Sequence, residues 1–237
     1  MPVAALRRTW PDFESRIFAL TRIIHEPVPI KTRLLNAKGK TVLQMTDWDQ
    51  LYREKETPWD RGEPAPPLVE FVEKQSLSGQ ILVPGCGIGH DARYLAEQGY
   101  IVHAIDISGT ALNRARSLHE SKALNLKFEK ANFLDESNGL PHAHFDLLFE
   151  HTCFCAIDPS DRARYAQAAN QILKPNGLLL GIFFTDMEND DGPPYPSSRD
   201  EIRSLFSTYF DTLNVWKPER SFPGREGEES MYLMRRL

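Results

Sequence analysis

Short apolar runs alternate with amphipathic stretches from Gln80 to the end of the chain. The runs have the length of buried strands, and the stretches between them repeat apolar residues at helical spacing. This alternation is typical of a parallel sheet with crossover helices. The expected strands are Ile81–Val83, Ile101–Asp106, Leu126–Lys130, Phe145–Glu150, Leu178–Phe184, Leu213–Trp216 and Met231–Met234. The predicted fold class is therefore α/β.

Four amphipathic helices are expected within this region. Ser108 and Ser160 precede two of them and are candidate N-caps, because a serine oxygen can accept from a free N–H of the first turn. A Pro- and Gly-rich loop, Asp191–Pro196, precedes the last helix. The expected helices are Asp91–Glu97, Ser108–Ser121, Ser160–Leu173 and Arg199–Tyr209.

Residues 1–44 show no strong hydrophobic period, whereas the segment that begins at Met45 resembles the natural start of a protein chain. We predict an N-terminal extension of uncertain order over 1–44 and one domain over 45–237. The extension holds eight Lys or Arg against three Asp or Glu. A targeting peptide is disfavoured because such peptides are poor in acidic residues.

Charge and composition narrow the range of partners. The extension carries +5 and the whole chain −5, so the remainder carries −10. A protein that binds nucleic acid needs a basic surface to contact the phosphates, and an acidic domain does not favour one. No apolar run approaches the roughly 18 residues needed to span a bilayer, and three cysteines give no disulfide framework. We expect a cytoplasmic monomer with a small-molecule substrate, and neither nucleic acid nor membrane as a partner.

The strongest local signal is ILVPGCGIGHD, an apolar strand that runs into Gly85, Gly87 and Gly89 and then into a helix. Glycines let the backbone turn tightly and approach a ligand closely. The next strand ends in Asp106, whose carboxylate can accept both hydroxyls of a ribose. Ligands of parallel α/β sheets lie at the carboxyl ends of strands. A nucleoside cofactor is therefore expected here.

Two cofactors fit a glycine loop followed by an acidic strand end: S-adenosylmethionine and NAD. The dinucleotide fingerprint GxGxxG keeps one more residue before its third glycine than the GxGxG found here. An NAD-dependent oxidoreductase is disfavoured by this spacing and by the lack of a recognisable second catalytic domain. After the third strand, Asn132 and Phe133 either flank an adenine or serve as a turn residue and a core residue.

Trp48, Tyr52 and Trp59 form an aromatic group in a short helix-then-turn segment upstream. Aromatic faces attract a sulfonium by cation–π contact, worth roughly 1–2 kcal/mol when desolvated. The segment would then act as a lid. In the alternative, Trp48 and Tyr52 are the buried stripe of an amphipathic helix.

Two motifs are similar to a metal site and to a nucleic-acid methyltransferase motif, but the details of each argue against that interpretation. His151, Cys153 and Cys155 have the spacing of metal ligands, but no fourth ligand is spaced nearby, so we expect core cysteines and no metal. DGPPYP is similar to the Pro-Pro-aromatic motif of nucleic-acid amino-methyltransferases. That motif follows the fourth strand, whereas this one follows the fifth.

An ordered set of motifs resembles the thiopurine S-methyltransferase family and its halide/thiol methyltransferase branch. The resemblance covers about Asp47 to the C-terminus. Its motifs are Trp48 with TPWD at 57–60, VPGCGIGHD at 83–91, DIS at 106–108, FCAI at 154–157, DRARYAQAANQIL, and GPPY followed by EIRSLF. It implies a Rossmann-like class I methyltransferase with a mostly parallel seven-stranded sheet, helices on both faces, and S-adenosylmethionine as cofactor.

The resemblance also implies roles for single residues. His151 would face the methyl group, Tyr195 would lie over the methyl acceptor, and Glu150 would stand on the cofactor side. Tyr52, Glu150 and His151 depart from the usual tryptophan, aspartate and tyrosine or arginine, which puts the substrate in doubt. The residues expected to hold the cofactor are Trp48, Tyr52, Trp59, Gly85, Gly87, Asp106, Asn132, Phe133 and Glu150.

The expected reaction is methyl transfer to a small soft nucleophile such as a thiol, thiopurine, sulfide, halide or selenium species. A thiol attacks as thiolate and titrates near pH ~8.5, so a nearby base would help. His151 is the candidate base, with Glu150 orienting its ring or capping the strand end. Alternatively, His151 is a partly buried histidine satisfied by backbone. Arg220 and Arg225 either receive an acidic acceptor or, the preferred reading, are solvated. A cofactor-binding protein without turnover also stays open.

Overall fold

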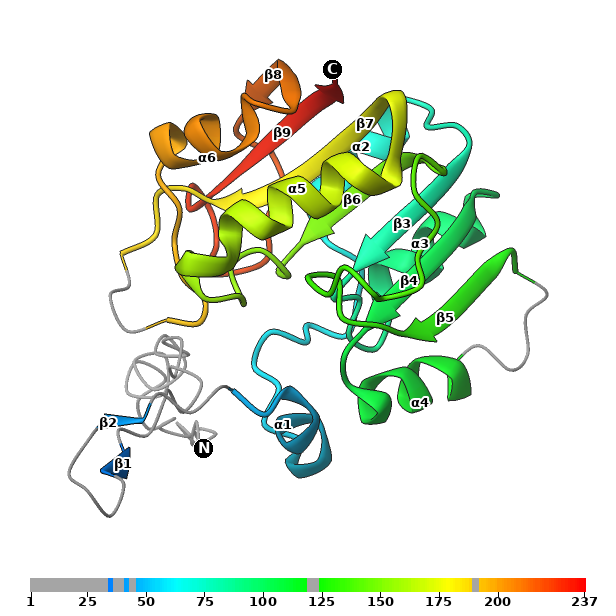
Figure 1. The fold of residues 1–237 in the computed structure, drawn as a ribbon. Coiled ribbons are helices and arrows are strands. Elements are labelled where there is room, and N and C mark those ends of the chain that lie inside the picture. Colours follow the sequence, from blue (N-terminus) through cyan, green and yellow to red (C-terminus); the bar gives the residue numbers. More distant parts are fainter. Residues whose placement is uncertain (1–33, 36–40, 43–45, 119–123, 189–191) are drawn as a thin grey trace, which may run out of the picture.

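A computed structural model describes residues 34–35, 41–42, 46–118, 124–188 and 192–237. A seven-stranded sheet has the order β5-β4-β3-β6-β7-β9-β8 (Figure 1). The first five strands in that order run parallel, and β9 pairs antiparallel with β7 and β8. The predicted mostly parallel sheet is confirmed. Its strands are β3 (Gln80–Pro84), β4 (Ile101–Asp106), β5 (Leu126–Lys130), β6 (Phe145–His151), β7 (Leu173–Phe184), β8 (Phe210–Trp216) and β9 (Glu229–Arg236).

Helices connect the strands and cover the sheet. Leu34–Leu35 (β1) and Thr41–Val42 (β2) form a separate two-stranded pairing within the predicted extension. The predicted start at Met45 and the end of the expected helix at Ser121 lie outside the described residues. The helices are α1 (Trp48–Glu54), α2 (Pro66–Lys74), α3 (His90–Glu97), α4 (Gly109–Ser117), the 3-10 turn η2 (Pro159–Asp161), α5 (Arg162–Ile172) and α6 (Arg199–Phe206).

Two hydrophobic cores lie on opposite faces of the sheet. Successive side chains of a strand point to opposite faces, so Leu148 of β6 joins one core while Leu147 and Phe149 join the other. The first core packs α5 and α6 against the sheet, and the second packs α2 and α3. Both faces are therefore covered by helices, as predicted.

Two details differ from the sequence-based expectations, and one predicted cap is confirmed. Helix α2 was not expected, although Pro66 stands at its first turn, where proline needs no hydrogen-bond donor. Ser108 caps α4 as predicted, by accepting from Ala111 N–H. Ser160 is not an N-cap. Its N–H and hydroxyl both donate to Asp158, because the carboxylate one residue before Pro159 begins the turn instead.

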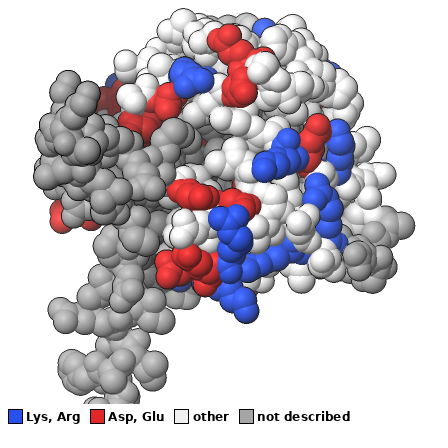
Figure 2. Space-filling model, turned by 60° about the horizontal axis from the view of Figure 1, so that its bottom comes forward, with Lys and Arg blue, Asp and Glu red and all other residues white. Residues whose placement is uncertain are grey.

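Charged side chains of both signs share the surface. On the face shown in Figure 2, Lys and Arg side chains form a curved band that Asp and Glu side chains border. Ion pairs join Arg53 to Asp49 and Arg164 to Asp161. Among the described helices, none is both long and apolar enough to cross a membrane.

Phe206 of α6 tests the first core. It is 1% exposed and packs against the rings of Phe154, Phe183 and Phe210. Phe206→Ala should lower the free energy of unfolding by about 3–5 kcal/mol, because the lost burial adds to the cost of a cavity. Urea denaturation measures this change in the free energy of unfolding. Leu213→Ala, on the exposed strand β8, is the control and should change stability by less than about 0.5 kcal/mol.

Candidate active site at the carboxyl ends of the parallel strands

A cavity of about 1070 Å³ opens where the parallel strands end. Its wall includes Gly85 after β3, Asp106 of β4, Ala131 after β5, His151 of β6 and Phe184 of β7. The volume lies at the upper end of ligand pockets, which span roughly 300–1,000 Å³. Ten of the eleven predicted site residues line it: Trp48, Tyr52, Trp59, Gly85, Gly87, Asp106, Asn132, Phe133, His151 and Tyr195.

The glycine loop needs glycine for two reasons. Gly85 and Gly87 have φ of 58° and 55°, a left-handed conformation that other residues rarely adopt. A Cβ on Gly87 would lie 2.6 Å from the Tyr52 hydroxyl, and one on Gly85 would lie 2.7 Å from the Cys153 Cβ. Gly89 does not line the cavity. Its missing Cβ makes room for the ring of Phe128, so it serves packing.

Asp106 links the glycine loop to the start of α4. One carboxylate oxygen accepts from Gly87 N–H and the other from Ser108 N–H, each at 2.8 Å. Burial raises the pKa of Asp106 despite these two donors. Each carboxylate oxygen has a second lone pair, and the residue lines the cavity. Asp106 can therefore accept hydroxyl groups from a ligand while it holds the loop.

Helix α1 is fastened over the cavity by Asp49, a residue that sequence reasoning missed. Its carboxylate accepts from Thr110 N–H at 2.9 Å and from the Ser108 hydroxyl at 2.7 Å. These bonds, the one from Thr110 N–H above all, lower the pKa of Asp49 to about 2. Arg114 of α4 also donates to Tyr52 O at 2.6 Å. Helix α1 is thereby tied to the N-terminus of α4 next to the cavity.

The aromatic group on α1 and the following turn forms one wall. Trp59 Nε1 donates to the Tyr52 hydroxyl at 2.9 Å, and the rings of Trp48 and Trp59 meet edge to face at 5.3 Å. Tyr52 is buried and Trp48 is not, so the pair is no simple buried stripe. The segment is partly buried and lines the cavity, and its role as a lid stays a prediction.

Asn132 and Phe133 are a turn residue and a core residue, as one of the two alternatives predicted, and both also line the cavity. Asn132 Oδ1 accepts from Leu134 N–H at 3.0 Å, so the residue shapes a turn, and it also lines the cavity. Phe133 is buried and meets the Tyr165 ring at 4.9 Å, yet it too contributes to the wall.

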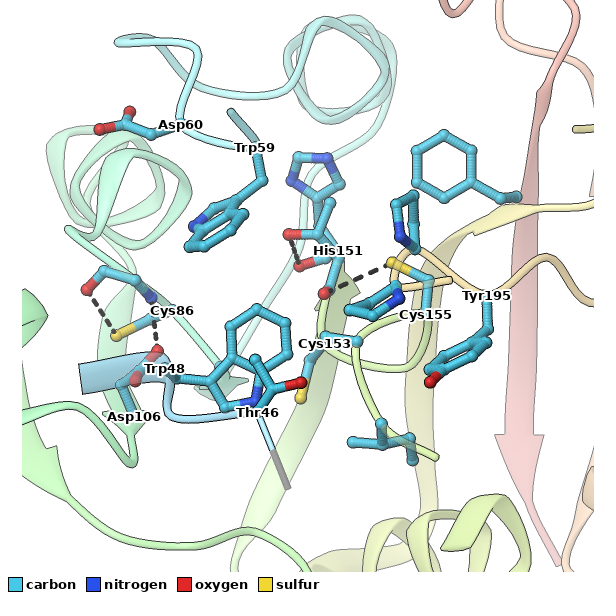
Figure 3. A pocket seen from close by; sticks show the side chains of 18 of the residues that line it. Thr46, Trp48, Trp59, Asp60, Cys86, Asp106, His151, Cys153, Cys155 and Tyr195 are labelled. Atoms are coloured by element: carbon cyan, nitrogen blue, oxygen red, sulfur yellow. Dashed lines mark hydrogen bonds between the residues drawn. The ribbon is translucent and has the colours of Figure 1, made fainter. Parts of the chain in front are cut away.

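His151 ends β6 near the middle of the cavity. In Figure 3, Trp48, Trp59 and Asp106 lie on one side of it and Tyr195 on the other. Its Nδ1 lies 2.7 Å from Asp91 Oδ2, and its Nε2 lies 3.5 Å from Nη1 of Arg225. The reading in which backbone groups satisfy the imidazole is wrong, because its two ring nitrogens face the side chains of Asp91 and Arg225. Asp91, within the GHD of the glycine motif, was missed as a partner.

Arg225 is a buried cation of the cavity wall. The expected solvated role is wrong for Arg225, which is 4% exposed, contacts Glu229 at 3.3 Å, and stacks over the rings of Phe184 and Phe222. The solvated role fits Arg220, which is half-exposed and paired with Glu73. Aromatic packing on a guanidinium explains how Arg225 tolerates burial.

Tyr195 lies in the GPPY loop after β7, the fifth strand of the sheet, as predicted. Its backbone N–H donates to Cys155 O at 2.7 Å, and its carbonyl accepts from the buried Arg162 at 2.8 Å. Arg162 is itself paired with Glu201 of α6. Tyr195 is therefore fixed to the turn after β6 and to the start of α5.

Glu150 is the one predicted site residue outside the cavity wall. It is fully buried and accepts from the N–H groups of Cys153 and Phe154 and from the Tyr165 hydroxyl. The proposal that it orients the His151 ring is wrong, because neighbouring residues of a strand point to opposite sides. It caps the end of β6 by holding the turn that follows.

The cysteines after β6 lie in that turn and not along a strand face. Burial raises the pKa of Cys155 to about 12 and that of Cys153 well above its usual range, so both are thiols at neutral pH. Cys155 packs with Phe184 and Met187, while Cys153 is half-buried. The described residues contain no group of three or more His, Cys, Asp or Glu that could hold a metal ion.

Comparisons with known proteins point to one family. The sequence profile of thiopurine S-methyltransferase matches residues 43–235. Thiocyanate methyltransferase 1 of Arabidopsis thaliana is 34% identical over 86% of this chain and 90% of its own length. Probable thiol methyltransferase 2 of the same plant is 36% identical, over 78% and 82%.

Solved structures share the fold. The 1,6-didemethyltoxoflavin-N1-methyltransferase of Burkholderia thailandensis, solved with S-adenosylhomocysteine bound, superimposes with a TM-score of 0.60 at 19% identity. The match covers 80% of this chain and 85% of that one. The Rossmann-like methyltransferase fold implied by the sequence motifs is confirmed.

Glu150 should make stability depend on pH. Burial raises its pKa to about 7 from 4.5, so the folded state binds this proton more tightly than the unfolded state does. The stabilisation is therefore complete below pH 4.5 and is lost as pH rises through about 7, by roughly 3 kcal/mol in total.

Glu150→Gln mimics the protonated side chain and keeps an oxygen for the two backbone donors. Chemical denaturation between pH 5 and 8 should show that the variant gains stability relative to the wild type as pH rises. A constant difference across this range would mean that Glu150 stays ionised in the fold.

Proposed function

This chain belongs to the thiopurine S-methyltransferase family and is a methyltransferase, and we propose that it moves the methyl group of S-adenosylmethionine to a small thiol or similarly soft nucleophile. The observation that carries the proposal is the single cavity wall that combines a left-handed glycine loop, a buried acidic strand end and a histidine that faces a carboxylate. Family membership overturns the alternative of an NAD-dependent oxidoreductase.

We assign the cofactor to the side of the cavity formed by the glycine loop and α1. Asp106 would accept the ribose hydroxyls, and Gly85 and Gly87 would let the backbone approach the ligand. Trp48 and Trp59 would cover the sulfonium with aromatic faces. Asn132 and Phe133 would flank the adenine. This arrangement leaves the region around His151 and Tyr195 for the acceptor.

S-adenosylmethionine, when bound, supplies an activated methyl group that an acceptor attacks in line. The protein then has to orient the acceptor and remove water from it. Arg225, Phe184 and Phe222 offer a buried cation between aromatic rings, which suits a soft nucleophile that carries or develops negative charge. We assign Tyr195 to the wall over this acceptor.

We propose that the physiological partner is a small molecule and not a nucleic acid, given the −5 net charge of the chain. A reducing, cytoplasmic compartment fits three cysteines that are all free thiols. A monomer stays our expectation.

Asp106→Ala should weaken S-adenosylhomocysteine binding by about 2–3 kcal/mol, because a charged hydrogen-bond acceptor to the ribose is lost. Isothermal titration calorimetry measures the affinity. Glu73→Gln, an exposed residue outside the cavity, serves as the control. Unchanged affinity in Asp106→Ala would refute the ribose assignment.

A methyl-transfer assay tests the reaction itself. With labelled S-adenosylmethionine and a panel of aliphatic thiols, aromatic thiols including thiopurines, sulfide, iodide and selenite, we expect a methylated product and S-adenosylhomocysteine in equal amounts. Tyr195→Phe should lower kcat by a larger factor than it weakens cofactor binding, because we assign Tyr195 to the wall over the acceptor and not to the cofactor side. Binding without any product across the panel would mean a cofactor-binding protein without turnover.

A further inference from the structure

We propose that Asp91 is a positioning residue that keeps the ring proton of His151 on Nδ1, so that Nε2 can take the proton of a thiol acceptor. This inference rests on the proposed function, because it concerns an acceptor that arrives protonated. Asp91 and His151 lie far apart in the chain, at the start of α3 and at the end of β6, and both line the cavity.

Asp91 is held at both oxygens. Oδ1 accepts from Ala65 N–H, and Oδ2 faces His151 Nδ1, each at 2.7 Å. Burial alone would raise the pKa of Asp91, but its interactions with His151 and with the Ala65 N–H lower it below the usual value. An ionised carboxylate only accepts hydrogen bonds. The Nδ1 atom that faces it must therefore carry a proton.

Arg225 fixes the opposite side of the ring. A guanidinium only donates, and Arg225 Nη1 is 3.5 Å from Nε2. Of the two neutral tautomers of the ring, a pure acceptor on one side and a pure donor on the other favour the one with its proton on Nδ1 and its lone pair on Nε2. The ring plane is also restrained, because Phe222 stacks on it at 6.4 Å with an interplanar angle of 20°.

The charged groups that face His151 have opposite signs. Asp91 faces it from α3, and Arg225 faces it from the loop before β9, where Glu229 partly neutralises the guanidinium. Glu150, the neighbour on β6, points away into the turn that it caps. Asp91 is thus the carboxylate that directly compensates a proton gained at Nε2.

The chemical step balances with these groups. The thiol proton moves to His151 Nε2, and the imidazolium that forms is stabilised by Asp91. The acceptor sulfur uses the freed electron pair to bond the methyl carbon, while the bond between that carbon and the sulfonium breaks and leaves its pair on the cofactor sulfur. The products are a thioether and S-adenosylhomocysteine, and the imidazolium returns its proton to water.

Asp91→Asn is the sharpest variant. It keeps Oδ1 for the Ala65 N–H and so preserves the start of α2, but it turns an NH₂ toward Nδ1 and removes the charge. At pH 7, kcat/KM for an aliphatic thiol such as 2-mercaptoethanol should fall about 100-fold or more, the scale of general-base catalysis. For an acidic aromatic thiol that is already ionised at this pH, such as 4-nitrothiophenol, the loss should be at least tenfold smaller.

A second readout uses a single acceptor. Aliphatic thiols titrate above neutral pH, so the defect of Asp91→Asn with 2-mercaptoethanol should shrink as pH rises from 7 to 9.5. S-adenosylhomocysteine affinity, measured alongside, reports whether the cavity is intact. Glu129→Gln is the matched control, because Glu129 of β5 also pairs with a histidine, His103 of β4, and does not line the cavity. It should leave all rates unchanged.

The outcomes separate the two claims. Equal losses with both thiols, constant from pH 7 to 9.5, would show that Asp91 serves only the structure and would overturn this inference. A wild-type protein that transfers methyl to no acceptor would overturn the proposed function itself. Selective loss with the protonated thiol, recovered at high pH, is the result that the geometry predicts.

Discussion

Buried or half-buried carboxylates at the ends of strands and helices hold this cavity together. Asp106 ties the glycine loop to α4, Glu150 ties the end of β6 to its following turn, and Asp91 ties α2 to His151. Each accepts backbone N–H groups that would otherwise be left without partners where regular structure stops. A buried carboxylate is costly unless such donors surround it. The loops that form the wall are therefore fixed by the same groups that bring charge into the cavity.

This constraint divides the cavity into two chemically different sides. Helix α1, fastened by Asp49, brings aromatic rings toward the glycine loop and Asp106. Near the end of β7, the wall holds Arg225 over the rings of Phe184 and Phe222. His151 lies at the junction, with a carboxylate on one ring nitrogen and a guanidinium near the other. The first side suits a nucleoside and the second a small soft acceptor.

Local patterns in the sequence were enough for the sheet and for most of the cavity wall. Strand periodicity, the glycine spacing and the acidic end of β4 each depend on residues close together in the chain. The strands and the cofactor loop can therefore be predicted from the sequence alone. The ordered motifs then identified the family. Helix α2 was not predicted because it lies before Gln80, where the regular alternation of strands and helices begins.

Contacts between distant residues could not be predicted in this way. His151 meets Asp91 across 60 positions and Arg225 across 74. The adjacent Glu150 was the obvious partner for the ring, yet strand geometry turns it to the opposite side. Arg225 was expected in solvent because arginine is usually exposed, and only the packing of Phe184 and Phe222 shows why it is buried.

A crystal structure of the complex with S-adenosylhomocysteine tests the central claim most directly. The account predicts the ribose hydroxyls on Asp106, the aromatic rings of α1 over the ligand, and the cofactor sulfur directed toward the space between His151 and Tyr195. A nucleoside bound elsewhere in the cavity, or a sulfur directed away from His151, would contradict it.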